Sequence, residues 1–312
     1  MTEFGFIEQI RRLFAPIPDQ GFEGIGDDCA ILPLADGQAL VFTADLLTEG
    51  VHFLRHATSA RELGGKSLAV NLSDVAAMGA RPVATLLSIA LPRDAAGAWA
   101  EEFIEGYREL SARYATPLIG GDTTRSEAGI TINVTAIGRA PIPHLKRRRD
   151  ARPDDTVFVA GELGASGSGL QEILAGRPDT PLAAVHRNPA PQVDEGFWLG
   201  NRPEVHAMMD LSDGLASDLP HILDLSHAGA EIDLERIPVA AGSDLKTAAC
   251  GGEDYKLLLT ADTAAAERLA AEFRSRFGTP LYPIGRITSG EGITWMRNGR
   301  AEELDWHGFT HY

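Results

Sequence analysis

Cysteine is scarce in this 312-residue chain, which contains only Cys29 and Cys250, far apart in the sequence. The two residues form no metal-ligand pair and are typical of reduced thiols in a reducing compartment. The nine histidines include no H-E-x-x-H motif, and no Cys/His cluster indicates zinc. The sequence therefore favours neither a disulfide scaffold nor a zinc enzyme.

Long apolar runs and positive charge are also lacking. No run approaches the ~18 apolar residues of a membrane-spanning helix, and the N-terminal MTEFGFIEQIRRLF has helical spacing in place of a signal peptide's unbroken apolar run. Lys and Arg number 28 against 44 Asp and Glu, a formal net charge of −16. Such a surface repels nucleic acid and anionic lipid unless a local basic patch overrides it. We expect a cytoplasmic protein with no nucleic-acid or membrane partner.

The length and the alternation of β-rich runs with helical patterns predict about two domains of α/β or α+β architecture. The segment Pro141–Pro153 lacks apolar periodicity and contains a basic run between prolines, so we place the domain boundary near residue 150. The expected domains are 1–150 and 151–312.

Periodicity predicts the following elements. Strands are expected over 39–44, 83–91, 130–138 and 156–160, and helices over 59–79 and 95–114. The first strand should end at Asp45, and Gly120-Gly121-Asp122 should form a turn. A glycine-rich turn over 161–169 should lead into a helix that begins near Leu170, and 177–192 should be a loop.

Two short motifs resemble binding sites without meeting their requirements. Gly64-Gly65-Lys66-Ser67 lacks the earlier glycine of a phosphate-binding loop, because position 60 is alanine, and no strand precedes it. It is therefore predicted to be helical. The basic run 146–152 is short and has no interleaved aromatic residues, so it indicates a solvated linker or a single phosphate contact.

The most informative feature is a set of aspartates beside glycines or short apolar runs. They are Asp27, Asp28, Asp45, Asp74, Asp122, Asp210 and Asp213. Each taken alone is better explained as a helix cap or turn residue than as a ligand. If they converge, two charges ~6 Å apart repel by roughly 3 kcal/mol, so the cluster requires cations. Oxygen ligands without thiolates select Mg²⁺, which substrate phosphates usually complete, and this points to a nucleotide and phosphoryl transfer.

Six segments in this order resemble the thiamine-monophosphate kinase family, within the superfamily of aminoimidazole-ribonucleotide-synthetase-like ATP-binding proteins. They are GIGDDCA, TADLLTEGVHF, KSLAVNLSDVAAMGARP, LIGGDTTR, MDLSDGLASDL and GGEDYKLL. The resemblance covers nearly the whole chain, from about Phe4 to DWHGF at 305–309. It implies a two-domain synthetase-like fold, with an N-terminal α/β sheet domain forming the core of a homodimer and a C-terminal α+β domain. It also implies ATP- and Mg²⁺-dependent phosphorylation of thiamine monophosphate to thiamine diphosphate.

The resemblance also implies roles for individual residues. The metal ligands would be Asp28, Thr43, Asp45, Asp74, Asp122, Asp210 and Asp213. ATP would contact Gly121, Asp122, Arg148, Ser212 and, as an adenine neighbour, Tyr107. Thiamine monophosphate would contact His52, Glu253 and Phe309, and the catalytic set would be Asp45, Asp122 and Arg148. One position departs from the family pattern: Ala44 stands where a hydroxyl residue is usual, so only its carbonyl could contribute.

Other readings stay open at this point. His52 could be a packed histidine, Glu253 a turn residue and Phe309 a docked tail. Another ATP-dependent synthetase of the superfamily is possible, although no cysteine–lysine nucleophile motif precedes GIGDD. A non-catalytic ATP-binding scaffold of the same fold is the third reading, and the full set of aspartates argues against it.

Overall fold

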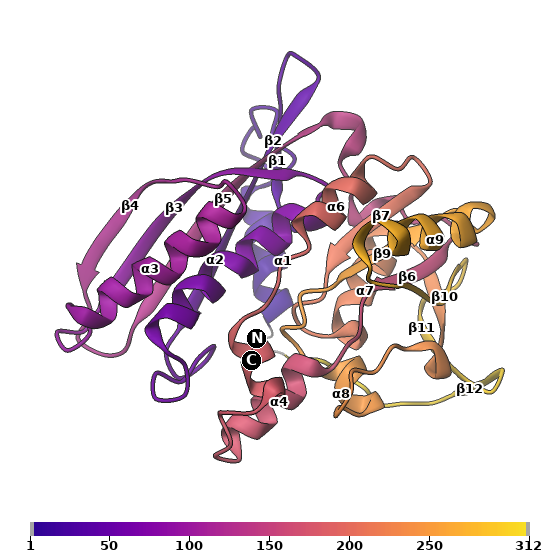
Figure 1. Cartoon of the computed structure of the whole chain (residues 1–312). Helices are drawn as coiled ribbons and strands as arrows, with labels where there is room; N and C mark the ends of the chain where they lie inside the picture. Colours follow the sequence, from indigo (N-terminus) through magenta and orange to yellow (C-terminus); the bar gives the residue numbers. More distant parts are fainter. Residues whose placement is uncertain (1–2, 310–312) are drawn as a thin grey trace.

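The computed structural model describes residues 3–309 and arranges them around two β-sheets (Figure 1). The first sheet has the order β1-β2-β5-β3-β4, with β3 and β4 parallel and the other neighbours antiparallel. Its strands are β1 (Ala30–Pro33), β2 (Gln38–Thr48), β3 (Arg81–Leu91), β4 (Leu118–Arg125) and β5 (Thr131–Pro141). The helices of this half are α1 (Glu3–Phe14), α2 (Ala60–Ala77) and α3 (Ala98–Arg113).

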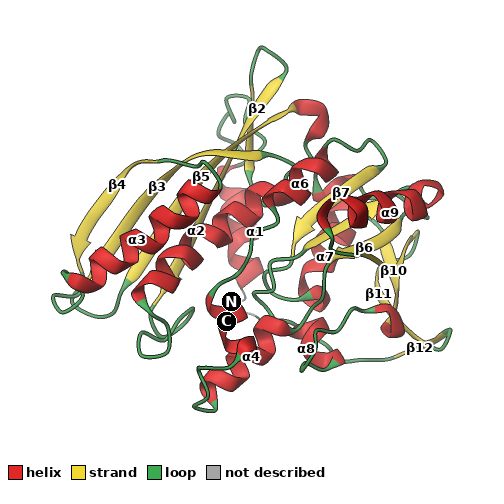
Figure 2. Cartoon of the chain, in the orientation of Figure 1, coloured by secondary structure: helices red, strands yellow, loops and turns green. Residues whose placement is uncertain are grey.

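The second sheet follows two 3-10 turns, Ile142–His144 and Arg148–Asp150, and has the order β12-β11-β8-β10-β6-β9-β7 (Figure 2). Its strands are β6 (Thr156–Ala160), β7 (Val205–Asp210), β8 (Gly229–Asp233), β9 (Leu257–Ala261), β10 (Leu281–Thr288), β11 (Gly292–Arg297) and β12 (Arg300–Glu302). The helices are α4 (Ala165–Leu174), α5 (Pro181–Arg187), α6 (Val193–Gly200), α7 (Leu215–Ser226), α8 (Leu245–Cys250) and α9 (Ala266–Phe277), with further 3-10 turns at Leu234–Arg236 and Thr263–Ala265. Two mixed sheets packed with helices confirm the predicted α/β class.

Helix α2 lies at the centre of the molecule and is buried on nearly all sides, which explains its mixed apolar spacing. It begins after Ser59, whose hydroxyl accepts from the Glu62 N–H while the Glu62 carboxylate accepts from the Ser59 N–H. A Cβ on Gly64 would lie 1.9 Å from the Phe103 carbonyl oxygen of α3. Gly64 of the rejected phosphate-loop motif therefore permits a close helix crossing.

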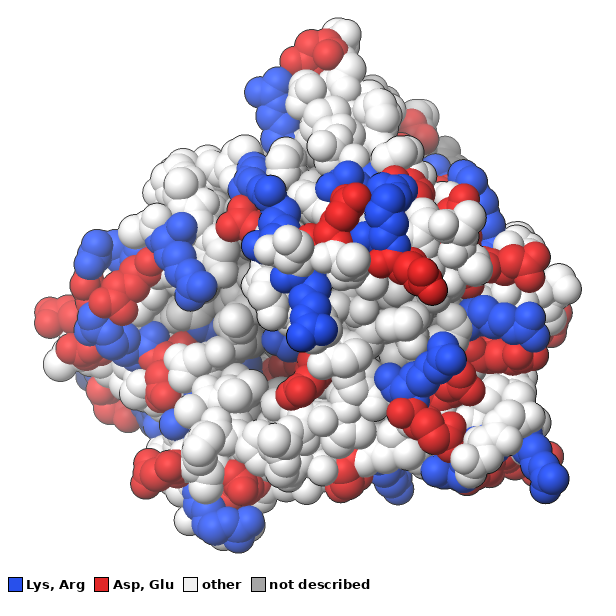
Figure 3. All heavy atoms as spheres, turned by 45° about the vertical axis from the view of Figure 1, so that its right-hand side comes forward, with Lys and Arg blue, Asp and Glu red and all other residues white. Residues whose placement is uncertain are grey.

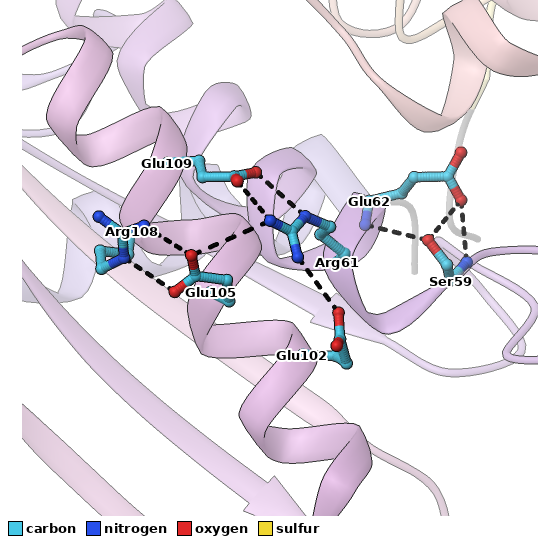
Figure 4. A network of polar contacts seen from close by, with 7 residues as sticks. All are labelled: Ser59, Arg61, Glu62, Glu102, Glu105, Arg108 and Glu109. Carbon is cyan, nitrogen blue, oxygen red and sulfur yellow. Dashed lines mark hydrogen bonds and ion pairs between the residues drawn. The ribbon is translucent and has the colours of Figure 1, made fainter.

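Surface ion pairs also join α2 to α3 (Figure 4). Arg61 of α2 lies against Glu102, Glu105 and Glu109 of α3, next to the capping box formed by Ser59 and Glu62. These side chains are exposed, so solvent screens each pair and its contribution to stability is small. The glycine-mediated packing beneath them is the stronger cause of this crossing.

The first sheet has one covered face and one open face. Helices α2 and α3 cover one side, whereas exposed apolar residues lie along the other (Figure 1). Leu46 of β2 is 54% exposed, Val83 of β3 is 40% exposed, and Leu86 of β3 is 37% exposed. Every residue of the edge strand β4 is exposed. The open face thus presents a broad apolar surface without a partner in the described chain.

Two predictions for the first sheet, a strand end at Asp45 and a turn at residues 120–122, are wrong. Strand β2 continues through Asp45 to Thr48, because β5 pairs with it over this whole length. Gly120-Gly121-Asp122 lies inside β4 and is not a turn. The glycines serve the close pairing with β3, since a Cβ on Gly121 would lie 1.7 Å from the Leu87 carbonyl oxygen.

Two further corrections concern the second half. Helix α4 begins at Ala165 and not near Leu170, because the Asp254 carboxylate, distant in sequence, accepts from the N–H groups of Gly164 and Ser166. The expected loop over 177–192 contains α5, whose start carries a Thr180 cap followed by Pro181. The first correction needed a tertiary contact, whereas the second had a local signal.

The domain boundary near residue 150 stays a prediction. Strands of the first sheet end at Pro141 and those of the second begin at Thr156. However, a single hydrophobic cluster contains Leu68 and Val70 of α2 together with Phe158 of β6 and Met208 of β7. The two halves therefore share a core. Among the described residues, no helix is long and apolar enough to cross a membrane.

Candidate active site

Three aspartates from separate elements meet between the two sheets. Asp28 precedes β1, Asp74 lies near the end of α2, and Asp210 ends β7. Each offers a carboxylate oxygen, and these oxygens lie within 4.8 Å of one another. The fold thus brings the three acidic motifs into one small region, although Asp28 and Asp210 lie 182 positions apart in the sequence.

Neighbouring side chains hold these carboxylates in place. The Thr43 hydroxyl donates to Asp74 Oδ2 at 2.5 Å, and the Ser73 hydroxyl donates to Asp210 Oδ2 at 2.5 Å. Asp28 Oδ2 is buried and has no hydrogen-bond partner among residues 3–309. A buried carboxylate oxygen without a donor is unfavourable, so this atom is suited to a cation.

Burial and mutual repulsion favour the protonated forms of the cluster. Burial, then Asp28, raises the pKa of Asp210 to about 8. Burial, then Asp45 and Asp210, raises the pKa of Asp74 well above its ordinary value. Burial, then Asp213, raises the pKa of Asp45 to about 6. Asp45 and Asp213 therefore belong to the same electrostatic unit, in which a divalent cation could replace the retained protons.

Arg148 supplies positive charge to the cluster. Its Nη2 lies 2.6 Å from Asp28 Oδ1, and its backbone N–H donates to Asp27 Oδ1 at 2.7 Å. The basic run is therefore not a solvated linker: Lys146 is buried, with its Nζ donating to the Arg202 and Val205 carbonyls. On the face shown in Figure 3, positive and negative side chains are interspersed.

A cavity of about 920 Å³ adjoins the cluster. Asp45 and Asp213 line it beside residues predicted to bind substrate and nucleotide. These are His52, Ser212, Glu253 and Phe309. His52 Nδ1 accepts from the Thr48 N–H at 3.0 Å, which places the proton of the neutral ring on Nε2. The Phe309 ring is about half exposed, and its N–H donates to the Asp213 carbonyl at 3.1 Å.

Glu253 belongs to a charged group that the sequence did not indicate. Lys66 Nζ lies 3.0 Å from Glu253 Oε2, and His186 Nδ1 lies 3.3 Å from the same oxygen. Lys66 was interpreted only as part of a helix, and His186 lies in the segment expected to be a loop. Asp218, which accepts from the N–H groups of Asp213 and Gly214, was also missed. No local pattern marks such long-range partners.

Three predicted site residues lie away from the carboxylate cluster in the structure. Tyr107 of α3 is 1% exposed, and its hydroxyl donates to Thr85 of β3 at 2.7 Å. Tyr107 is therefore a core residue of the described chain, and its contact with adenine stays a prediction that the structure does not support. Gly121 and Asp122 lie on β4, whereas Asp45 lies on β2. Strands β5 and β3 lie between them, so three strand spacings separate β2 from β4, a distance of about 14 Å.

Comparisons with known proteins agree with this architecture. The model of the AIR synthase related protein N-terminal domain matches residues 26–140, and that of the C-terminal domain matches residues 152–296. The thiamine-monophosphate kinase of Escherichia coli (strain K12) is 37% identical over 304 residues, covering 93% of this chain and 91% of that protein.

Solved structures show the same similarity. One, described as "AaThiL complexed with AMPPCP and TMP", has a TM-score of 0.85 and 31% identity, and the match covers 100% of this chain and 97% of that one. The thiamine-monophosphate kinase of Stenotrophomonas maltophilia K279a has a TM-score of 0.77 and 36% identity, covering 96% of this chain and 98% of that one. With its two AIR synthase related domains, the chain belongs to the thiamine-monophosphate kinase family.

Proposed function

We propose that the protein transfers the γ-phosphoryl group of ATP to thiamine monophosphate, which yields ADP and thiamine diphosphate. The observation that carries this proposal is the junction between the carboxylate cluster and the cavity, where Asp45 and Asp213 face the same space as Glu253 and Phe309. A phosphate-binding metal site beside a pocket with apolar walls suits a phosphorylated ring compound. Membership of the family supports the assignment.

We infer that Mg²⁺ ions occupy the carboxylate cluster during turnover. The donors are all oxygens, and the unpartnered Asp28 Oδ2 is an available ligand atom. The residues that would hold the ions are Asp28, Thr43, Asp45, Asp74, Asp210 and Asp213. Bound Mg²⁺ would supply charge neutralisation for the transferring phosphoryl group.

The phosphate group of thiamine monophosphate can accept the phosphoryl group without a general base from the protein. A phosphate monoester has a second pKa near 6, so its oxygens are mostly ionised at neutral pH and need no general base. We infer that His52 orients the acceptor, because its Nε2–H is a donor suited to an anionic oxygen. Direct in-line transfer without a phospho-enzyme follows.

We infer that the protein acts as a homodimer whose open sheet faces meet. Asp122 of β4 pairs in register with Ser88, which pairs with Asn133, which pairs with Leu46. Residues in one such row share a face, so Asp122 lies on the open apolar face. Packing two such faces together would bury the exposed leucines and carry β4 toward the other subunit's site.

The nucleotide contacts are proposed on the same basis. Ser212 and Arg148 come from the subunit that holds the cluster, whereas the partner subunit's Gly121 and the partner subunit's Asp122 would complete the site. This division explains why a single chain keeps Asp122 away from Asp45.

The activity is tested by following ATP consumption with Mg²⁺ and thiamine monophosphate, free thiamine or selenide as the second substrate. We expect consumption only with thiamine monophosphate, together with formation of thiamine diphosphate. Preference for free thiamine would refute the proposal, because a hydroxyl acceptor needs a general base. Consumption with selenide would assign the chain to another reaction.

A further inference from the structure

Lys66 is an ammonium group enclosed by protein. It lies in the middle of α2, its side chain is 1% exposed, and its Nζ is 3.0 Å from Glu253 Oε2. A second contact joins Nζ to the His52 carbonyl at 3.5 Å. Burying a cation costs several kcal/mol unless a partner compensates it. The pair also joins residues 187 positions apart, so it connects α2 to the wall of the substrate cavity.

The Glu253 carboxylate is used asymmetrically. Oε2 contacts Lys66 and also lies 3.3 Å from His186 Nδ1, which is 2.9 Å from the Ser166 hydroxyl. Oε1 accepts no hydrogen bond from the described residues, although the side chain is 23% exposed and lines the cavity. One oxygen is thus held by protein, and the other is available to a ligand.

The backbone at Glu253 is also constrained. Its φ is +64°, a conformation that non-glycine residues rarely adopt. The Glu253 N–H donates to the Ser212 carbonyl at 2.7 Å, which fixes the residue from the other side. Strain of this kind persists only where surrounding contacts enforce it, and it is common at ligand sites.

We propose that Lys66 and His186 are positioning residues that hold Glu253 as a fixed, ionised acceptor, so that Oε1 selects an N–H donor on the ring system of the substrate. This inference rests on the proposed function, because that function supplies a substrate whose pyrimidine ring bears an exocyclic amine. A carboxylate can only accept hydrogen bonds. An analogue with a carbonyl oxygen in place of the amine would present an acceptor to an acceptor.

The electrostatics agree with this geometry. Burial alone would raise the pKa of Glu253, but the Lys66 cation and His186 outweigh it and bring the pKa below its ordinary value. Burial, then Lys66, lowers the pKa of His186 to about 4, so this ring is neutral at physiological pH. Lys66 therefore brings a full positive charge to the carboxylate, whereas His186 contacts it as a neutral ring.

The test compares Lys66→Met, His186→Gln and Glu253→Gln with the double variant K66M/E253Q. Lys256→Met is the matched control, because it removes a lysine three residues beyond Glu253 that is not among the cavity-lining residues. We expect K66M to raise the KM for thiamine monophosphate roughly tenfold and H186Q to raise it by about threefold, with the KM for ATP nearly unchanged. In the E253Q background, K66M should add less than about twofold. K256M should behave as wild type.

A second readout is the preference for thiamine monophosphate over its carbonyl analogue. We expect a wild-type preference of roughly 30-fold that falls several-fold in K66M, because a Glu253 without its cation can take up a proton and donate. An unchanged KM and preference in K66M would overturn the proposal. The proposal would also be overturned if K66M raised the KM for thiamine monophosphate by the same factor in the wild-type background and in the E253Q background. If K66M alone does not fold, H186Q tested with and without E253Q decides the question.

Binding measurements separate this inference from the proposed function. Calorimetric titration of each variant with thiamine monophosphate measures the same contrasts without phosphoryl transfer. Selective binding without ATP consumption would refute only the proposed reaction. A normally active wild type whose variants bind equally well would refute only the positioning role. A wild type that does not bind thiamine monophosphate would refute both.

Discussion

Asp210→Asn should make the metal-free protein less sensitive to pH. An unfolded aspartate loses its proton near pH 3.8, whereas the pKa of Asp210 in the folded protein is raised to about 8 by burial and by Asp28. The folded state therefore binds more protons between these values, and stability falls as the pH rises. At about 1.4 kcal/mol per pKa unit, Asp210 alone should cost the metal-free protein about 3 kcal/mol between roughly pH 5.5 and pH 8.

Thermal unfolding in the presence of a chelator measures this effect. The wild-type melting temperature should fall by on the order of 5–10 °C over that pH range. Asp210→Asn should remove the part of this fall that Asp210 causes and leave the part that Asp74 and Asp45 cause. Asp224→Asn, an exposed aspartate on α7, is the control and should keep the wild-type slope. Added Mg²⁺ should stabilise the wild type at the higher pH by mass action, and stabilise Asp210→Asn much less.

Two results would refute this reasoning. If wild-type stability is flat or rises between these pH values, the cluster does not retain protons in the folded state. If Asp210→Asn shows the wild-type slope, the pH dependence comes from other groups.

Three further outcomes are expected. Asp45→Asn and Asp122→Asn should each be nearly inactive. A mixture of the two variants should recover about a quarter of wild-type turnover, because half of the dimers would contain both variants and each of these would have one intact site of two. No recovery would place both residues in one subunit's site. Arg148→Ala should lower the free energy of unfolding of the metal-free protein by about 3 kcal/mol, since it leaves Asp28 buried without its counter-charge. The same variant should weaken ATP binding more than thiamine monophosphate binding. An equal loss of both affinities would mean that the segment containing Arg148 orders the whole site. Phe309→Ala should raise the KM for thiamine monophosphate roughly 3- to 30-fold through lost ring contact; a lower melting temperature with both KM values unchanged would make Phe309 a tail anchor only.

The sequence predicts those features that depend on local pattern. The helix predicted over 59–79 and the strand predicted over 156–160 were recognisable because apolar spacing and apolar runs are local signals. The sequence alone does not show that Asp28, Asp74 and Asp210 cluster; it predicts only that the aspartates need cations if they converge.

Other features depend on contacts that no local pattern records. The cap that Asp254 places on α4 and the Lys66–Glu253 pair join distant segments. Tyr107 shows a different limit: the family pattern implies a ligand contact, whereas packing buries the ring in the core. Asp122 could be identified as acidic and exposed, but motif order cannot tell which subunit's site a residue serves.

The hydrophobic cluster shared by the two halves restricts how substrates enter. Leu68 of α2 and Phe158 of β6 belong to the same buried cluster, so a hinge opening between the sheets would expose apolar surface. Each 100 Å² exposed would cost about 2.5 kcal/mol, so a widely opened state would be rare at equilibrium. We therefore expect thiamine monophosphate to enter through the mouth of the existing cavity, with motion confined to segments such as the one around Phe309. The catalytic cycle would then leave the relative orientation of the two sheets unchanged.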